Sequence, residues 1–300
     1  MNYGDKGEDV AELQRALMER GYKLPRYSDD GHLGDETWSA LEQYSKAELG
    51  VWDPEVPGGV IESLQDPINP ITPLPDPCDP GSKVPVLDLR SEQTDPAPKS
   101  KVVNGHTVMR APHTITGITL HQTACTYGVS QNQINAAGGD RELALHRRAL
   151  GVACHAMAFM DGTLVLTNDV ERYIYHGNGL NSFTLGLEVE GRYPGLTNEP
   201  DKTTWGGDPT PLTGATVAAA QEGVRKLVEL GRQAGCPITH IYAHRQSSET
   251  RRSDPGEGLW RHVVLDYAVP VLGLKAVQSF TVGSGEPIPV EWDSNGVGNY

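Results

Sequence analysis

Three side chains of the types that bind zinc lie at or near the ends of predicted strands. His121 follows the apolar run 115–120, and His244 follows the short β-rich run 239–243. Asp254 comes ten residues after His244, in a Ser-Asp-Pro-Gly turn that would hold its carboxylate in a fixed direction. Two imidazoles and one carboxylate are a suitable ligand set for catalytic zinc, with a fourth position left for water. The chain has 10 histidines, and a lone histidine is more often a surface or core residue, so the prediction depends on this arrangement.

A sheet must bring these side chains together, and the sequence after about residue 115 has the required pattern. Strand-like runs cover 115–120, 184–190 and 239–243, and residues 156–167 read as a hairpin around Asp161-Gly162. An amphipathic helix is expected over 213–234, and a second over 260–272 despite Pro270. Strands mixed with helices favour an α/β domain built around a mixed β-sheet flanked by helices.

The first part of the chain has a different texture. Helical spacing of apolar residues covers 8–20 and 35–48, with a turn-rich loop at 28–34 between them. Residues 53–98 then hold half of the 22 prolines, which is typical of an extended, semi-rigid spacer. We therefore predict four segments: a small helical domain, a proline-rich linker, a catalytic domain and a loose C-terminal tail, at 1–52, 53–112, 113–278 and 279–300.

Composition excludes some functions. The net charge of −14 is spread along the chain, so nucleic-acid binding has no electrostatic support. No apolar window of about 18 residues exists, so we expect no membrane insertion. The four cysteines form no C-x-x-C pattern, which favours isolated thiols made in a reducing compartment. Residues 1–6 run into charged side chains without the apolar core of a signal peptide, so we expect synthesis in the cytoplasm. The oligomeric state stays open.

Glycines and apolar residues recur at family-like spacing through the first fifty residues. The matching positions are Gly4, Gly7, Val10, Leu13-Gln14, Leu17, Gly21, Asp30-Gly31-His32-Leu33-Gly34, Thr37, Ala40-Leu41 and Tyr44. This segment resembles the small all-α, three-helix peptidoglycan-binding domain of many wall hydrolases. The resemblance implies bacterial peptidoglycan as the partner. Most of the apolar positions are expected in the core, and binding would fall to exposed side chains near the Asp-Gly loop.

A second set of motifs spans about residues 113–272. It comprises His121, Cys154-His155-Ala156, Tyr175-His176-Gly177, Leu185-Gly186-Leu187-Glu188-Val189-Glu190-Gly191, and His244 followed by Asp254-Pro255-Gly256. This pattern resembles the type-2 N-acetylmuramoyl-L-alanine amidases, a family shared with phage amidases and animal peptidoglycan-recognition proteins. The resemblance implies a zinc-dependent enzyme that cleaves the bond between N-acetylmuramic acid and L-alanine. It also implies that His121, His244 and Asp254 are the zinc ligands.

The same resemblance suggests roles for four further side chains. Glu188 matches a catalytic glutamate, and Arg252 lies where family members usually carry a catalytic lysine. His176 and Asn181 lie where the family lines the substrate groove. Each has a plainer alternative.

Glu188 could be a solvated strand residue, and Glu190 shares its face as a structural partner. Arg252 could be a surface charge beside Arg251, and His176 could be structural. Some relatives use a tyrosine at the position of Cys154, so its absence favours a mechanism based on Glu188.

Two other activities remain open at this stage. The chain could recognise peptidoglycan without cutting it, although non-catalytic relatives typically lose a zinc ligand. It could also be a zinc peptidase that cuts within the stem peptide. A wall amidase without a signal peptide suggests a phage endolysin released by a holin, or an injected effector, acting on the bacterial cell wall.

Overall fold

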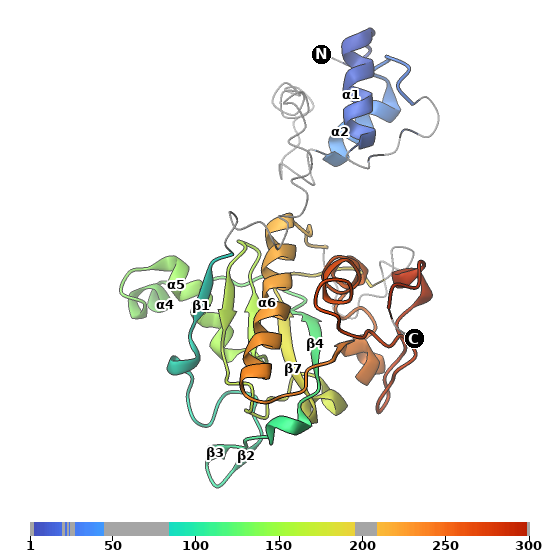
Figure 1. The fold of residues 1–300 in the computed structure, drawn as a ribbon. Coiled ribbons are helices and arrows are strands. Elements are labelled where there is room, and N and C mark those ends of the chain that lie inside the picture. Colours follow the sequence, from blue (N-terminus) through green and yellow to red (C-terminus); the bar gives the residue numbers. More distant parts are fainter. Residues whose placement is uncertain are drawn as a thin grey trace. The chain divides into compact units, whose positions relative to one another are not determined.

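The computed structural model describes residues 3–19, 22, 24, 28–44, 84–195 and 209–298. The chain forms two compact units, residues 1–76 and 77–300, and each is described by itself (Figure 1). The part of the predicted spacer between residues 53 and 83 lies outside the described residues. No helix in the described part is long and apolar enough to cross a membrane.

The N-terminal unit contains helices α1 (Glu8–Glu19) and α2 (Asp35–Tyr44). The apolar faces predicted for both helices pack into one small core. Its buried members are Val10, Leu13, Leu17, Leu24, Leu33, Ala40, Leu41 and Tyr44. The predicted third helix is not among the described residues of this unit, and the same is true of the predicted extension of α2 over 45–48.

A buried amide joins the two helices to the loop between them. The Gln14 side chain on α1 donates to Asp30 Oδ1 at 2.8 Å and to Thr37 Oγ1 at 2.9 Å, while its oxygen accepts from the Gly31 N–H at 2.8 Å. Gly31 has φ +72°, and a Cβ there would lie 2.9 Å from the Gly7 carbonyl oxygen. Only glycine fits this turn without strain, so the Asp-Gly loop has a defined shape.

The second unit is organised around a six-stranded mixed sheet, as predicted. Its order is β1-β6-β5-β7-β4-β8, with β5, β7, β4 and β8 parallel to one another. β5 and β6 form the predicted antiparallel hairpin, and β1 pairs with β6 in parallel. The strands are β1 (Val86–Asp88), β4 (Gly117–Gln122), β5 (Ala156–Ala158), β6 (Leu164–Leu166), β7 (Thr184–Val189) and β8 (His240–Ala243). Residues 102–107 form a separate small hairpin, β2 (Val102–Val103) and β3 (His106–Thr107).

Helix α6 (Gly214–Gln233) lies along one face of the sheet (Figure 1) and packs on β5, β6 and β7. It begins at the predicted position because the Thr213 hydroxyl accepts from the Thr216 N–H, which caps the helix. A Cβ on Gly223 would lie 2.7 Å from Leu187, so the glycine permits close contact with β7. The shorter helical elements are α4 (Gln131–Ala136), α5 (Arg141–His146), α7 (Glu257–Leu259) and the π-helical segment Trp260–Ala268.

Residues 84–112 were predicted to end the spacer, but the structure builds them into the second unit. β1 lies at the edge of the sheet, and the Pro85 carbonyl accepts from the Leu164 N–H at 2.9 Å. Leu89 is buried after this strand. Prolines are compatible with an edge strand, where one side of the backbone needs no ladder partner. The proline content therefore did not exclude a strand here.

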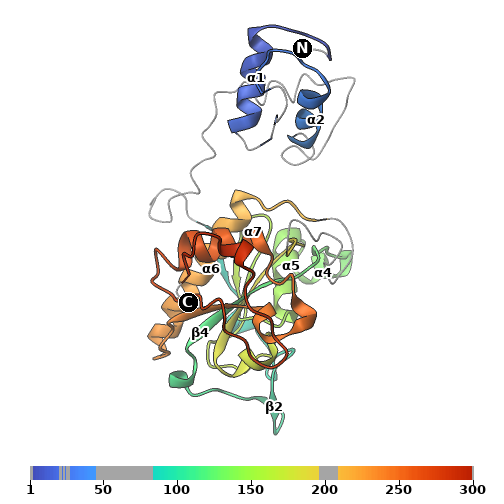
Figure 2. The same cartoon turned by 90° about the vertical axis from the view of Figure 1, so that its right-hand side faces the viewer.

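The C-terminal segment was expected to be loose, yet it packs against the second unit (Figure 2). Ile288 and Trp292 are buried, and the Trp292 ring lies 6.4 Å from that of Trp260. The Trp292 Nε1–H donates to the Gly195 carbonyl. This segment is therefore part of the folded unit, although its glycines and prolines leave it without long regular elements.

We expect Trp292→Ala to destabilise the protein by about 3–5 kcal/mol, because it removes a fully buried aromatic side chain. Val290→Ala is the matched control, since Val290 lies two residues away and is 68% exposed. Urea unfolding of the full chain, followed by circular dichroism, measures both variants. Equal unfolding midpoints for the two variants would show that the segment is not anchored as described.

Candidate metal centre

Strand register places the predicted ligands at one end of the parallel strands. β4 lies between β7 and β8, and His121 on β4 pairs in register with Glu188 on β7. Neighbouring in-register side chains project from the same face of a sheet. His244 follows β8 directly, and Asp254 lies in the loop before α7. The fold thus assembles side chains that are up to 133 positions apart in the sequence.

The three predicted ligands converge on one point. His121 Nδ1 lies 3.0 Å from His244 Nδ1, His244 Nδ1 lies 2.8 Å from Asp254 Oδ2, and His121 Nδ1 lies 3.7 Å from the same oxygen. All three side chains are buried. Ligand atoms around a tetrahedral zinc ion with bonds of about 2.0–2.1 Å lie about 3.3 Å apart. The donor set therefore fits a small divalent cation.

The hydrogen bonds behind His121 assign its tautomer. The Thr184 carbonyl can only accept, so His176 Nε2, at 3.2 Å, carries the proton. His176 Nδ1 then accepts from His121 Nε2–H at 3.1 Å. This leaves the lone pair of His121 Nδ1 free to face His244 and Asp254. His176 is thus a positioning partner of the kind that metal-binding histidines usually have.

Electrostatics favour ligand-competent protonation states. Burial lowers the pKa of His121 to about 4, so its ring is neutral at pH 7. Burial alone would raise the pKa of Asp254, but the electrostatic effect of the neighbouring imidazoles, that of His244 first, outweighs it and holds the pKa below its usual range. A neutral imidazole and an ionised carboxylate are the forms that bind metals.

Asp254 is fixed by groups that the sequence analysis did not single out. The Gln122 N–H donates to Asp254 Oδ1 at 3.0 Å, and the Gln122 side chain bonds the carbonyls of Tyr193 and Ser253. The Arg245 guanidinium donates to the Arg252 carbonyl in the same loop. The sequence offered one signal for Gln122, which is its position directly after His121 on the strand. Arg245 gave none, because its partners come from distant segments.

The two acidic residues of the β7 motif differ in their surroundings. The Glu190 carboxylate accepts from the N–H groups of Tyr127 at 2.7 Å and Met160 at 3.1 Å, so it holds two loops. Glu188 Oε2 is enclosed and accepts no hydrogen bond from any described residue. Burial, and then the charge of Asp254, raise the pKa of Glu188 well above its usual value, while Arg251 acts in the opposite direction. Of the two carboxylates, Glu188 is the one available for proton transfer.

The two residues predicted to line the substrate groove are buried instead. His176 is 4% exposed and Asn181 is 6% exposed. Asn181 Oδ1 accepts from the Gly177 N–H at 2.5 Å, and its carbonyl accepts from Arg110 at 2.8 Å. Their polar atoms are used within the protein, and their role in lining a substrate groove stays a prediction.

A buried arginine supports this layer. Arg110 donates to the carbonyls of Asn181, Thr184 and Val170, at 2.8, 2.6 and 2.7 Å, and burial lowers its pKa to about 10. His155 lies beside it and accepts from the Gly186 N–H at 3.0 Å, so it supports the fold. Nothing in the sequence distinguished Arg110, because it lies in the segment assigned to the spacer.

Arg252 lies at the surface in this structure. Its side chain is 58% exposed, and its Nε donates to Glu286 Oε1 at 2.8 Å. Its neighbour Arg251 has a charge that lowers the pKa of both Glu188 and His121. Both arginines lie on the loop that carries Asp254. Arg251 acts electrostatically on His121 and Glu188, whereas Arg252 pairs with Glu286 at the surface.

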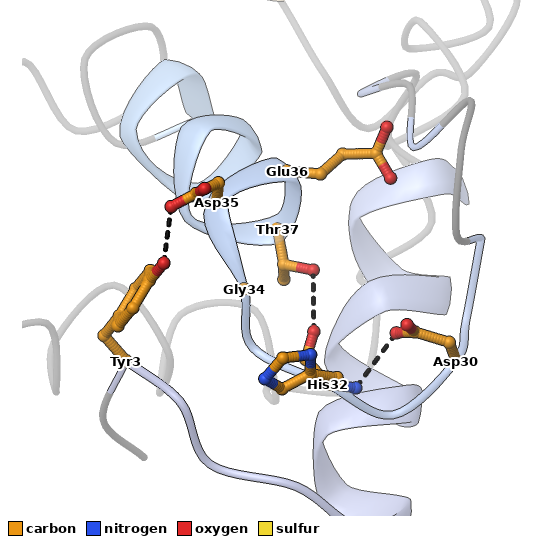
Figure 3. Close-up of a pocket in the computed structure, with 7 residues that line it drawn as sticks. All are labelled: Tyr3, Asp30, His32, Gly34, Asp35, Glu36 and Thr37. Carbon is orange, nitrogen blue, oxygen red and sulfur yellow. Dashed lines mark hydrogen bonds between the residues drawn. The ribbon is translucent and has the colours of Figure 1, made fainter.

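The N-terminal unit has a cavity of about 460 Å³ beside its Asp-Gly loop (Figure 3). The Tyr3 hydroxyl donates to the Asp35 carboxylate, and the Asp30 carboxylate accepts from the His32 N–H at 3.0 Å. Its lining is largely polar and acidic: Tyr3, Asp30, His32, Gly34, Asp35, Glu36 and Thr37. This is the part of the unit where the sequence placed exposed binding side chains.

Comparison with known proteins identifies the second unit. Residues 111–257 match the family model described as N-acetylmuramoyl-L-alanine amidase. No curated protein matches the chain significantly. The mixed sheet thus defines an α/β domain with a candidate three-ligand site, and the family match places that domain in the type-2 amidases. The chain carries a domain of the family that cleaves or recognises peptidoglycan.

Several solved structures are distantly similar. The amidase LysC from Clostridium intestinale has a TM-score of 0.36 and 16% identity, over 63% of this chain and 98% of that chain. Bumblebee PGRP-SA has a TM-score of 0.33 and 17% identity, over 57% and 88%. The endolysin of Thermus scotoductus bacteriophage Ph2119 has a TM-score of 0.32 and 13% identity, over 59% and 98%. At these TM-scores the similarities carry no argument about activity.

We expect His176→Ala to weaken zinc binding by about 10–100-fold, because His121 loses the acceptor that orients its ring. His176→Gln keeps an acceptor and a donor on the side chain and should recover part of the affinity. His113→Ala, at an exposed position, is the control for loss of an imidazole. Competition with a chromophoric chelator measures the affinities. Unchanged affinity in a folded His176→Ala protein would contradict the positioning role.

Proposed function

We propose that this protein is a zinc-dependent N-acetylmuramoyl-L-alanine amidase that cleaves the bond between N-acetylmuramic acid and L-alanine in peptidoglycan. One observation carries the proposal. Two imidazole nitrogens and a carboxylate converge in an amidase-family domain, and an unengaged carboxylate, Glu188, lies in register beside one of them. A protein that only recognises peptidoglycan needs the fold, but it needs neither the complete set of three ligand side chains nor the unengaged carboxylate of Glu188.

His121, His244 and Asp254 would hold the zinc ion through Nδ1, Nδ1 and a carboxylate oxygen. When bound, zinc supplies Lewis-acid polarisation of the carbonyl and lowers the pKa of water to about 7. His176 keeps the His121 ring in the correct tautomer, and the Gln122 N–H keeps the Asp254 carboxylate in place. The protein therefore offers a preorganised site, with one ligand on a strand, one directly after a strand and one in an anchored loop.

Glu188 would act as the general base and then as the general acid. It accepts a proton from the attacking water as the new carbon–oxygen bond forms at the lactyl carbonyl. It then gives that proton to the nitrogen of L-alanine as the amide bond breaks, so that the products are a carboxylic acid and a free amine. Burial suits this role, because a raised pKa makes the carboxylate a better proton acceptor. A cation at the ligand set would oppose that rise, because a nearby positive charge favours the ionised carboxylate.

Arg252 is our candidate for stabilising the developing negative charge on the carbonyl oxygen, a contribution worth about 3 kcal/mol for a well-placed donor. Its ion pair with Glu286 is exposed, and exposed pairs contribute little stability, so the side chain can exchange partners when substrate binds. Arginine at this position keeps the positive charge of the usual lysine but offers a different donor geometry.

The N-terminal unit would attach the enzyme to its polymer. The cavity beside the Asp-Gly loop combines a tyrosine ring with hydroxyl and carboxylate groups, a combination suited to sugar hydroxyls and amino groups. The domain limit of 1–52 for this module remains a prediction. Delivery to the wall by a holin or an injection machine is likewise a prediction from the sequence.

The decisive experiment is digestion of isolated peptidoglycan by the full chain, analysed by mass spectrometry. We expect free stem peptides that begin with L-alanine, lost after chelation and restored by zinc. Fragments cut within the stem peptide would make the protein a peptidase instead. Binding to the wall without any release of peptide would make it a recognition protein.

We expect Glu188→Gln to lower turnover by about 10²–10⁴-fold, because the amide cannot accept the proton. Zinc content should stay at the wild-type level, since Glu188 is not among the three ligands. Glu249→Gln, at an exposed position on a neighbouring loop, should keep wild-type turnover. Peptide release and bound zinc are measured on the same samples. Wild-type turnover in Glu188→Gln would remove Glu188 from the mechanism.

A further inference from the structure

A second set of three metal-ligating side chains lies outside the amidase site. Glu142, His146 and Asp161 each offer one ligand atom, and these atoms lie within 4.8 Å of one another. His146 Nε2 is 2.9 Å from Asp161 Oδ2. Among the described residues, only this set and the His121–His244–Asp254 set bring three such groups together. The two sets share no residue.

Local structure brings the three side chains together. Asp140 caps α5 by accepting from the Leu143 N–H at 2.9 Å, which sets where the helix begins. Glu142 and His146 are then four residues apart and lie on the same face of the helix. Asp161 comes from the turn between β5 and β6, where its Oδ1 accepts from the Thr163 N–H at 2.9 Å. That bond leaves Oδ2 directed at His146.

The site combines a rigid ligand with accessible ones. The His146 ring is buried against Phe159, with 4.9 Å between ring centroids, so its position is fixed by packing. Glu142 and Asp161 are exposed. Cavities of about 510 and 340 Å³ adjoin the cluster, and Glu142 lines both of them, so an ion has a path from solvent. The nearby charges are Arg141 and Asp140, which offset each other.

An ordinary histidine–carboxylate pair does not have this arrangement. His262 and Asp266 are also four residues apart on one helical segment, with 3.0 Å between Nδ1 and Oδ2. No third ligand among the described residues accompanies that pair. The additional carboxylate of Glu142 changes the chemistry, because one imidazole and two carboxylates match the preferences of zinc and manganese.

We propose that Glu142, His146 and Asp161 form a second divalent-cation site, for an ion of the zinc or manganese class, that joins α5 to the β5–β6 turn. The site is structural and goes beyond the proposed amidase function. It needs no catalytic step, because an ion bound by two separate segments stabilises the folded state that holds them together.

The test is a count of bound metal on the full chain after equilibration with zinc, or with manganese, and removal of free ion. Zinc is measured by inductively coupled plasma mass spectrometry. The wild-type protein should hold two equivalents, and Glu142→Gln/Asp161→Asn should hold one. The control Asp266→Asn should keep two. Because metal content is counted directly, the result does not depend on whether the protein proves to be an amidase.

A second measurement covers weak binding. Zinc at about a hundredfold excess over its Kd should raise the Tm of a His244→Ala protein by roughly 5–10 °C through the remaining site. The rise should vanish when Glu142→Gln and Asp161→Asn are added. A single zinc equivalent in the wild-type protein, together with no Tm response in His244→Ala, would overturn the proposal. Two equivalents in Glu142→Gln/Asp161→Asn would overturn it as well.

Discussion

The hydrogen-bond chain from the Thr184 carbonyl through His176 to His121 is the constraint on which the metal centre depends. Each bond in it runs in one direction, because the carbonyl at its origin can only accept. The direction of the first bond therefore decides which nitrogen of His121 faces the other ligands. Burial enforces the same outcome, since it keeps both imidazoles neutral at pH 7. The position of the Thr184 carbonyl in the sheet therefore determines which tautomer His121 adopts.

The third ligand is held by a different device. Asp254 lies in a loop, and loops position groups less firmly than strands do. Here the end of β4 compensates, because Gln122 bonds both the Asp254 carboxylate and the neighbouring backbone. Arg245 adds a second anchor to the same loop, and its guanidinium lies 5.1 Å over the Trp292 ring and pairs with Glu286. The C-terminal segment therefore supports the Asp254 loop through Arg245, which donates to the Arg252 carbonyl.

The sequence predicted those features that depend on local pattern. The apolar runs before His121 and His244 mark buried strands, and the ten-residue spacing to Asp254 marks the loop, so the convergence of these three side chains could be predicted. The burial of His176 and Asn181 could not be predicted, because it depends on contacts with Arg110, Thr184 and Gly186, which approach from other segments. The glycine and proline content also gave a wrong prediction for the C-terminal segment, which was expected to be loose. Two apolar side chains, Ile288 and Trp292, fix that segment, and composition averages hide them.

The buried Trp260–Trp292 contact belongs to the core of the second unit. The family match ends at residue 257, before either tryptophan. The family match and the packed unit therefore have different limits in this chain, because the match stops before the C-terminal segment that supports the Asp254 loop. A fragment cut at the edge of the family match would keep every metal ligand and Glu188. It would nevertheless expose the apolar surface of α6 and the sheet, and would leave the Asp254 loop without the partners of Arg245.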